Sequence, residues 1–171
     1  MWECGAAVLA LALGVGCDHG LGPEPAGTAG IAGTVEFVGP WPPQIGEVAV
    51  AVYRDHPQTA ADFLQLSGYD TGLTLGASPQ EYRVDLQGEG VHDWVIAVWR
   101  GPDSFWDFTS LLGCYHVAGD TLPSPVAVTA GQVTGGVDIT VDFSILSGGA
   151  RREWDLCSGA LPPELLNEAD Q

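Results

Sequence analysis

Residues 137–143 have the sequence Val-Asp-Ile-Thr-Val-Asp-Phe, in which apolar and polar side chains alternate without a break. Successive side chains of a β-strand point to opposite faces, so the four apolar residues share one face. A shift of one residue would bury both aspartates and expose the apolar set. This stretch therefore predicts a half-buried strand with a well-specified register.

Six further segments show strand-like patterns and are separated by turn residues. Residues 47–53 and 94–99 are apolar on both faces, which is typical of a strand that is covered on both sides. The other four segments are 31–37, 82–86, 111–117 and 126–129. The chain contains 24 Gly and 12 Pro, and it lacks lysine, a helix-forming residue. We therefore predict an all-β fold, a single seven-stranded antiparallel β-sandwich.

Helical patterns are minor in this chain. Residues 59–64 predict two helical turns with Thr59 as the N-cap, and residues 163–169 predict a short C-terminal helix. Residues 103–112 fit either a helix or a strand. The sandwich is therefore expected to carry one or two short helices.

Three of the strand segments also carry motifs. These are Ile-x-Gly-x-Val-x-Phe at 31–37, Tyr-x-Val-x-Leu at 82–86, and Gly-Gln-Val-Thr-Gly-Gly-Val-Asp-Ile-x-Val-Asp-Phe at 131–143. In this order they resemble the carboxypeptidase-regulatory-like, prealbumin (transthyretin)-like sandwich of exported bacterial proteins. The resemblance covers about residues 30–144 and implies an immunoglobulin-like sandwich outside the cytoplasm. That pattern includes no catalytic residues, so none is implied here.

The N-terminal segment resembles a bacterial lipoprotein signal peptide. Residues 5–16 are uncharged and mostly Ala, Val and Leu, and Gly14 and Gly16 precede Cys17. The run is shorter than the roughly 20 apolar residues of a transmembrane helix. The resemblance implies cleavage before Cys17 and a diacylglycerol on its thiol. The chain lacks the usual basic start and has Gly14 where Leu is favoured, so an ordinary cleaved signal or an apolar N-terminus are the alternatives.

These patterns divide the chain into four parts. We predict a lipoprotein signal peptide at 1–16, a flexible tether rich in Gly and Pro at 17–29, the sandwich domain at 30–146, and a C-terminal extension at 147–171 that packs on the domain or trails from it. The expected location is the bacterial cell envelope, on the periplasmic or the surface side of a membrane.

The charge balance excludes some partners. The chain has 22 acidic residues against five arginines, giving a formal net charge of −17. Such a chain repels phosphate backbones, so we expect no nucleic acid partner. Anionic membrane surfaces are disfavoured as well, and membrane contact is expected through the N-terminal lipid only.

Cysteine usage leaves one pair in the predicted domain. Cleavage would remove Cys4 and lipidation would use Cys17, so Cys114 and Cys157 remain in an oxidising compartment. A disulfide between them would stabilise the fold by about 3–4 kcal/mol. The alternative is one buried thiol and one mobile thiol.

The sequence lacks the motifs of an enzyme or a cofactor site. No serine stands in a Gly-x-Ser-x-Gly frame, and no Cys-His pair is evident. Carboxylate pairs such as Asp103 with Asp107 or Asp138 with Asp142 are too common in so acidic a chain to indicate catalysis. His92 and His116 are interpreted as exposed loop residues in preference to a metal pair. We predict no catalytic residues, no metal and no cofactor.

Aromatic residues are the better indication of function. Trp41, Trp106, Trp99 and Phe105 are candidate ligand-binding residues, because rings in sandwich loops stack on sugar faces. The favoured alternative is that such rings cover the ends of the core. Trp94 and Trp99 are separated by an odd number of residues, so they are expected on opposite faces of one strand.

Three functions are compatible with these observations. The first is a non-catalytic, lipid-anchored envelope protein that binds a partner protein or has a structural role. The second is a carbohydrate-binding module that uses loop tryptophans to hold a polysaccharide. The third is a hydrolase, which only the supply of carboxylates supports.

Overall fold

The computed structural model describes residues 28–106, 110–147 and 151–168. The predicted signal peptide at 1–16, Cys17 and the tether as far as residue 27 lie outside the described residues.

Strands are the main regular structure in the described part of the chain. They are β1 (Ala29–Val38), β2 (Glu47–Tyr53), β3 (Gly68–Asp70), β4 (Gln80–Leu86), β5 (Gly90–His92), β6 (Trp94–Arg100), β7 (Leu111–Cys114), β8 (Val126–Val128), β9 (Val133–Thr134) and β10 (Ile139–Asp142). The helical elements are the 3-10 helices η1 (Ala60–Leu64) and η3 (Phe143–Ser147) and the α-helices α1 (Arg151–Ser158) and α2 (Pro163–Glu168). The fold is all-β with short helices, as predicted.

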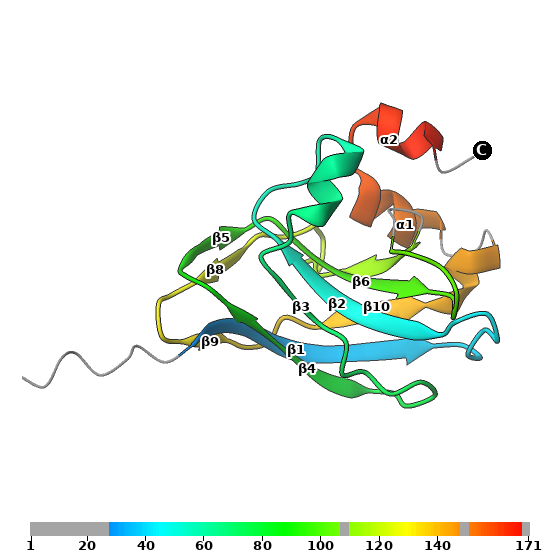
Figure 1. Ribbon diagram of the computed structural model, residues 1–171, viewed down its shortest axis with the longest axis horizontal. Coiled ribbons are helices and arrows are strands. Elements are labelled where there is room, and N and C mark those ends of the chain that lie inside the picture. The colour runs from blue at the N-terminus through cyan, green and yellow to red at the C-terminus, as the bar shows by residue number, and fades with distance from the viewer. Residues whose placement is uncertain (1–27, 107–109, 148–150, 169–171) are drawn as a thin grey trace, which may run out of the picture.

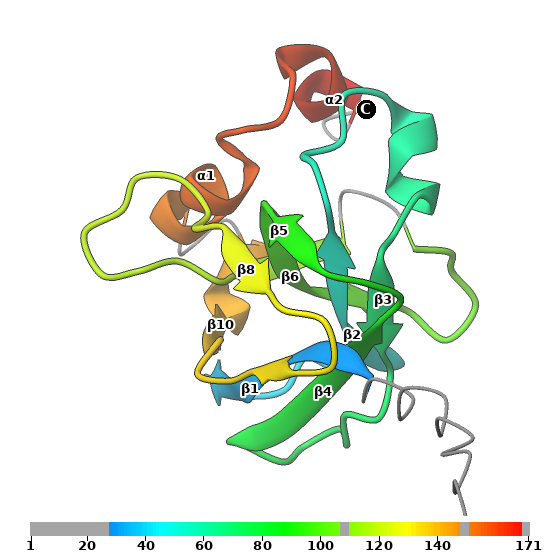
Figure 2. The same cartoon turned by 90° about the vertical axis from the view of Figure 1, so that its left-hand side faces the viewer.

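These described strands form three sheets (Figure 1). One has the order β10-β1-β4, and β9 also pairs with β1. The second has the order β3-β2-β6-β7, and the third is the two-stranded pair β5-β8. Figure 2 shows β1 and β4 below the second sheet and the α-helices above it.

The predicted strand list is correct but incomplete. All seven predicted segments contain strands, namely β1, β2, β4, β6, β7, β8 and β10. Sequence reasoning missed β3, β5 and β9, which have only two or three residues and so no detectable alternation. It also missed α1 and η3, whereas α2 and η1 fall within the predicted helical segments.

The expectation of antiparallel pairing throughout is wrong for β1. This strand pairs in parallel with β9 and with β10, where Val35 faces Ile139, and antiparallel with β4. Side-chain alternation has the same period in both kinds of pairing, so the sequence pattern specifies the buried face and leaves the strand direction open.

Side chains from both four-stranded sheets form the main core. Val137, Ile139, Val141 and Phe143 are all buried, and Asp138 and Thr140 are exposed. The buried face predicted for residues 137–143 is therefore confirmed, whereas the strand itself is shorter than predicted and Phe143 begins η3. The opposing sheet contributes Val48, Val50, Val52, Val95, Ala97 and Leu112.

Gly33 allows the chain to pass close to β1. A Cβ atom at this position would lie 2.1 Å from the carbonyl oxygen of Val137, which is far inside contact distance. The same oxygen accepts a hydrogen bond of 2.6 Å from the buried Tyr82 hydroxyl. The glycine of the Ile-x-Gly-x-Val-x-Phe motif is thus required by a close backbone approach.

A second apolar cluster lies on the outer face of the β3-β2-β6-β7 sheet. Its members include Ala51, Tyr53, Trp94, Ile96, Leu111, Cys114, Cys157 and Leu161. Phe63 of η1 packs against it, so helical segments cover this face. This second layer explains why β2 and β6 are apolar on both sides. It also places Trp94 in the second cluster and Trp99 against the main core, on opposite faces as predicted.

Candidate functional site

A pocket of about 490 Å³ opens on the outer face of the β3-β2-β6-β7 sheet. Its floor consists of outward-facing residues of β2, β6 and β7, and its walls come from η1, from Leu66, Tyr69 and Thr71, and from Trp106. The lining residues are Glu47, Ala49, Ala51, Tyr53, Phe63, Leu64, Leu66, Tyr69, Thr71, Trp94, Ile96, Val98, Trp106 and Leu111. This volume is within the usual range of small-molecule sites.

Two small residues create the hollow. Ala49 and Ala51 are successive outward-facing residues of β2, and they lie opposite Val98 and Ile96 of β6. Neither alanine has a side chain beyond Cβ, so the floor of the pocket lies close to the backbone. The pocket therefore extends along β2 from Glu47 at one end to Tyr53 at the other.

The rim of the pocket is apolar and exposed. Leu64 is 84% exposed, Tyr69 63% and Trp106 38%. Single exposed apolar residues are common on protein surfaces, but a group of them around an apolar hollow is typical of a binding site. The residues that the structure describes thus leave this part of the sheet partly uncovered.

Polar groups are few among the described residues that line the pocket. Arg100 Nε donates a hydrogen bond of 2.6 Å to Glu47 Oε2, Arg100 Nη2 contacts the same oxygen, and the Arg100 guanidinium lies 5.4 Å from the Trp106 ring centroid. The Tyr53 hydroxyl donates to the carbonyl of Phe63 at 3.1 Å. Burial raises the pKa of Tyr53 to about 12, so this hydroxyl remains a donor at neutral pH. Arg100, Glu47 and Tyr53 thus each have a partner within the protein.

The structure separates the four predicted ligand-binding aromatics. Trp41 packs on Phe37 and Phe143, with ring centroids 4.6 and 4.8 Å away, and so covers the core as the alternative proposed. Trp99 is half-buried against the same core. Trp106 lines the pocket, and Phe105 next to it is 90% exposed.

Sequence reasoning missed most of the pocket. Tyr53, Phe63, Tyr69 and the two floor alanines were not candidates. The sequence signal for this site lies in residues 47–53 and 94–99, which are apolar on both faces. One face packs on the main core, so the other face requires a second layer to cover it. The small residues within 47–53 indicate where such a layer leaves space.

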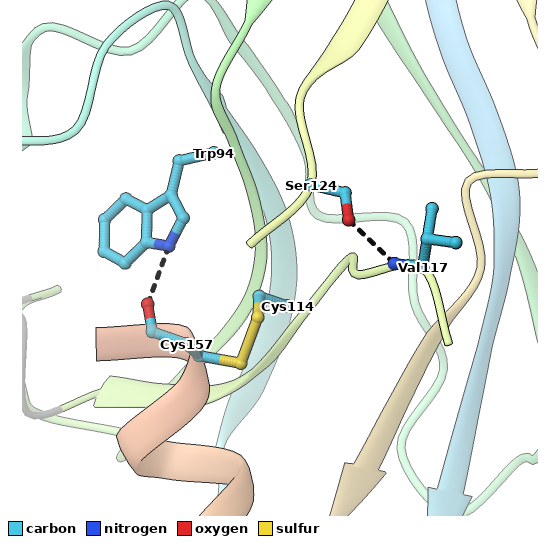
Figure 3. The surroundings of a disulfide bond; sticks show 5 residues. All are labelled: Trp94, Cys114, Val117, Ser124 and Cys157. Atoms are coloured by element: carbon cyan, nitrogen blue, oxygen red, sulfur yellow. Dashed lines mark hydrogen bonds between the residues drawn. A yellow bond between two sulfur atoms is a disulfide. The ribbon is translucent and has the colours of Figure 1, made fainter. Parts of the chain in front are cut away.

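A disulfide bond joins Cys114 of β7 to Cys157 of α1, with Cα atoms 5.5 Å apart (Figure 3). Beside it, the indole nitrogen of Trp94 donates a hydrogen bond of 2.9 Å to the carbonyl of Cys157. Both cysteine side chains are buried. The cross-link and this hydrogen bond attach α1 to the sheet at one end of the pocket.

Two of the four carboxylates considered for acid–base chemistry, Asp138 and Asp142, have structural contacts. Asp138 Oδ1 accepts hydrogen bonds from the backbone and hydroxyl of Thr34, and Asp142 Oδ1 accepts one from the backbone of Ser144. Asp107, which was considered together with Asp103, lies outside the described residues. Among the described residues no three His, Cys, Asp or Glu side chains are placed to hold a metal ion.

Comparisons with protein-family models, with curated proteins and with solved structures found no match to this chain. Within the residues that the structure describes, no helix has both the length and the apolar character needed to span a membrane.

His92 is buried, which corrects its interpretation as an exposed loop residue. It lies in β5 with 2% of its surface exposed, and within the described part of the chain neither ring nitrogen has a hydrogen-bond partner. Desolvation lowers the pKa of His92, nearby Arg54 adds to this effect, and Asp93 opposes it. Desolvation also lowers the pKa of His56. The folded chain therefore favours neutral imidazoles.

We expect stability to fall as the pH falls below about 6.5, the ordinary histidine pKa, because the unfolded chain then binds protons that the folded chain excludes. The free energy of unfolding should have a shallower pH dependence between about pH 5 and 7 in His92→Phe than in the parent chain. Urea unfolding at several pH values measures this. An unchanged slope would show that His92 is charged in the fold or does not contribute.

Proposed function

We propose that this chain is a non-catalytic binding protein of the cell envelope that holds a small apolar ligand in the pocket over β2 and β6. The observation that carries this proposal is the pocket itself, an apolar hollow of about 490 Å³ with an exposed apolar rim. We further propose that the two larger sheets form a prealbumin-like sandwich, supported by their shared core. The signal-like N-terminus supports export and a lipid anchor at Cys17.

Carbohydrate binding is the second candidate, and one observation favours it. Trp106 and Tyr69 both line the pocket and expose their rings. Sugar recognition also needs many polar groups around the rings, whereas the described lining is mostly apolar, and Trp41 and Trp99 are packed on the core. We therefore expect an apolar ligand to bind and soluble polysaccharides not to bind.

A neutral fluorescent probe, N-phenyl-1-naphthylamine, tests the pocket in titrations of the purified full-length chain. We expect saturable binding to one site. Ala49→Leu places a branched side chain in the hollow and should weaken binding by about tenfold or more. Ala127→Leu makes the same change on the exposed face of β8 and is the matched control. Equal binding by both variants would exclude the pocket, and saturable polysaccharide binding lost in Trp106→Ala would favour the second candidate.

The lipid anchor is tested separately from the pocket. We expect Cys17→Ser to move the chain from the membrane fraction to the soluble fraction, because the thiol is the site of acylation, and to leave probe affinity unchanged. Fractionation of cells expressing each form measures the first effect. If Cys17→Ser stays in the membrane fraction, the anchor is not at this cysteine.

A further inference from the structure

The pocket has different chemistry at its two ends. Glu47, the first residue of β2, lines one end and is the one described carboxylate among the lining residues. From there the outward-facing residues of β2 are Ala49, Ala51 and Tyr53, a length of about 20 Å along the strand. The ligand space is therefore elongated and apolar, with a charged group at one end.

The carboxylate of Glu47 is only partly used by the protein. Both contacts from Arg100 are made to Oε2, and among the described residues no hydrogen bond reaches Oε1. The Glu47 side chain is 29% exposed, and a ligand in the pocket would remove much of its remaining water. Burying an acceptor without a donor is costly, so a well-matched ligand must supply a donor there.

The charge of the chain favours a cationic ligand group over an anionic one at this end of the pocket. The formal net charge is −17, which attracts cations and repels anions in the surrounding solution. Arg100 uses Nε and Nη2 on Glu47, and its Nη1 donates to the carbonyl of Ser104 at 3.4 Å. The guanidinium also lies over the Trp106 ring, so it is engaged on several sides. A ligand carboxylate at this end would face Glu47 rather than an open cation.

We propose that the pocket takes an amphipathic primary amine, with its apolar body along β2 and its ammonium on Glu47 Oε1. This proposal rests on the proposed function and adds the chemical class of the ligand. The ammonium donates to the unused carboxylate oxygen, and the apolar body replaces water over Ala49, Ala51 and Ile96. An ion pair between ammonium and carboxylate makes a stronger hydrogen bond than a hydroxyl does.

The test uses three probes with the same alkyl chain: decylamine, decanol and decanoate. Each displaces N-phenyl-1-naphthylamine from the purified full-length chain. We expect decylamine to bind about tenfold more tightly than decanol, and decanoate to bind more weakly than either. Glu47→Gln should reduce the ratio of decylamine affinity to decanol affinity from about ten to about one.

Glu36→Gln is the matched control, because it removes the same charge from an exposed residue of β1. If Glu36→Gln lowers amine affinity as much as Glu47→Gln does, the preference comes from net charge and the proposed contact is wrong. Equal affinity of the parent chain for decylamine and decanol would overturn the proposed amine ligand. It would leave the proposal of an apolar binding pocket intact. Failure of the parent chain to bind the naphthylamine and all three alkyl probes would overturn both proposals.

Discussion

Replacing both Cys114 and Cys157 with alanine is expected to lower the free energy of unfolding by about 4 kcal/mol. The cysteines are 43 residues apart in sequence, and cross-linking a loop of this length restricts the unfolded chain by about this amount. The bond also holds α1 against β7, so its loss should loosen the second cluster before the main core. Urea unfolding of both forms, followed by circular dichroism, measures the change.

Reduction of the parent chain is the matched control for this result. It breaks the cross-link and retains both sulfur atoms, so it separates chain restriction from the loss of buried side chains. We expect reduction to account for most of the effect. A loss below about 1 kcal/mol in both experiments would show that helix packing alone maintains this part of the fold.

Trp94→Ala is expected to destabilise the chain by about 3–5 kcal/mol, the usual cost of truncating a buried tryptophan. Trp94 is 1% exposed, and its ring centroid lies 5.4 Å from Tyr53 and 6.0 Å from Phe63. It also donates the hydrogen bond to the Cys157 carbonyl. One side chain thus joins β2, η1 and α1, and chemical unfolding of the variant measures its contribution.

One variant shows which part of the Trp94 side chain contributes to stability, and a second variant, at Trp106, is the control. Trp94→Phe retains a ring but removes the donor to Cys157, and we expect it to cost about 1–3 kcal/mol. Trp106→Ala changes a tryptophan on the pocket rim and should cost well under 1 kcal/mol. If Trp94→Ala were no worse than Trp106→Ala, the second cluster would contribute little to stability. The effects of Trp94 and the disulfide should not add, because they share Cys157.

Much of the fold follows from local pattern. Alternation at 137–143 identifies the strand and its buried face, and Glu47–Tyr53 has the predicted bounds. The C-terminal helix also begins at the predicted residue, Pro163. Strand direction and sheet order depend on contacts between distant residues, which alternation within one segment does not encode. For this reason the parallel pairing of β1 with β10 was not predicted.

The candidate site was less predictable than the fold. Tryptophan counts draw attention to rings, but whether a ring covers a core or lines a pocket depends on the layer packed against it. Trp41 and Trp106 both follow strands in loops, yet Trp41 packs on Phe37 and Phe143 whereas Trp106 borders a hollow. The hollow is formed by small side chains, Ala49 and Ala51, which have no distinctive pattern of their own.

The pairing of β1 with β10 also affects the order in which the strands assemble during folding. Val35 pairs with Ile139, so the first strand of its sheet lacks one neighbour until nearly the whole domain has been synthesised. Closing so long a loop is entropically costly before the contacts form, and proteins rich in distant contacts fold slowly. Under the proposed export, this sheet would be completed only after residues 139–142 had crossed the membrane.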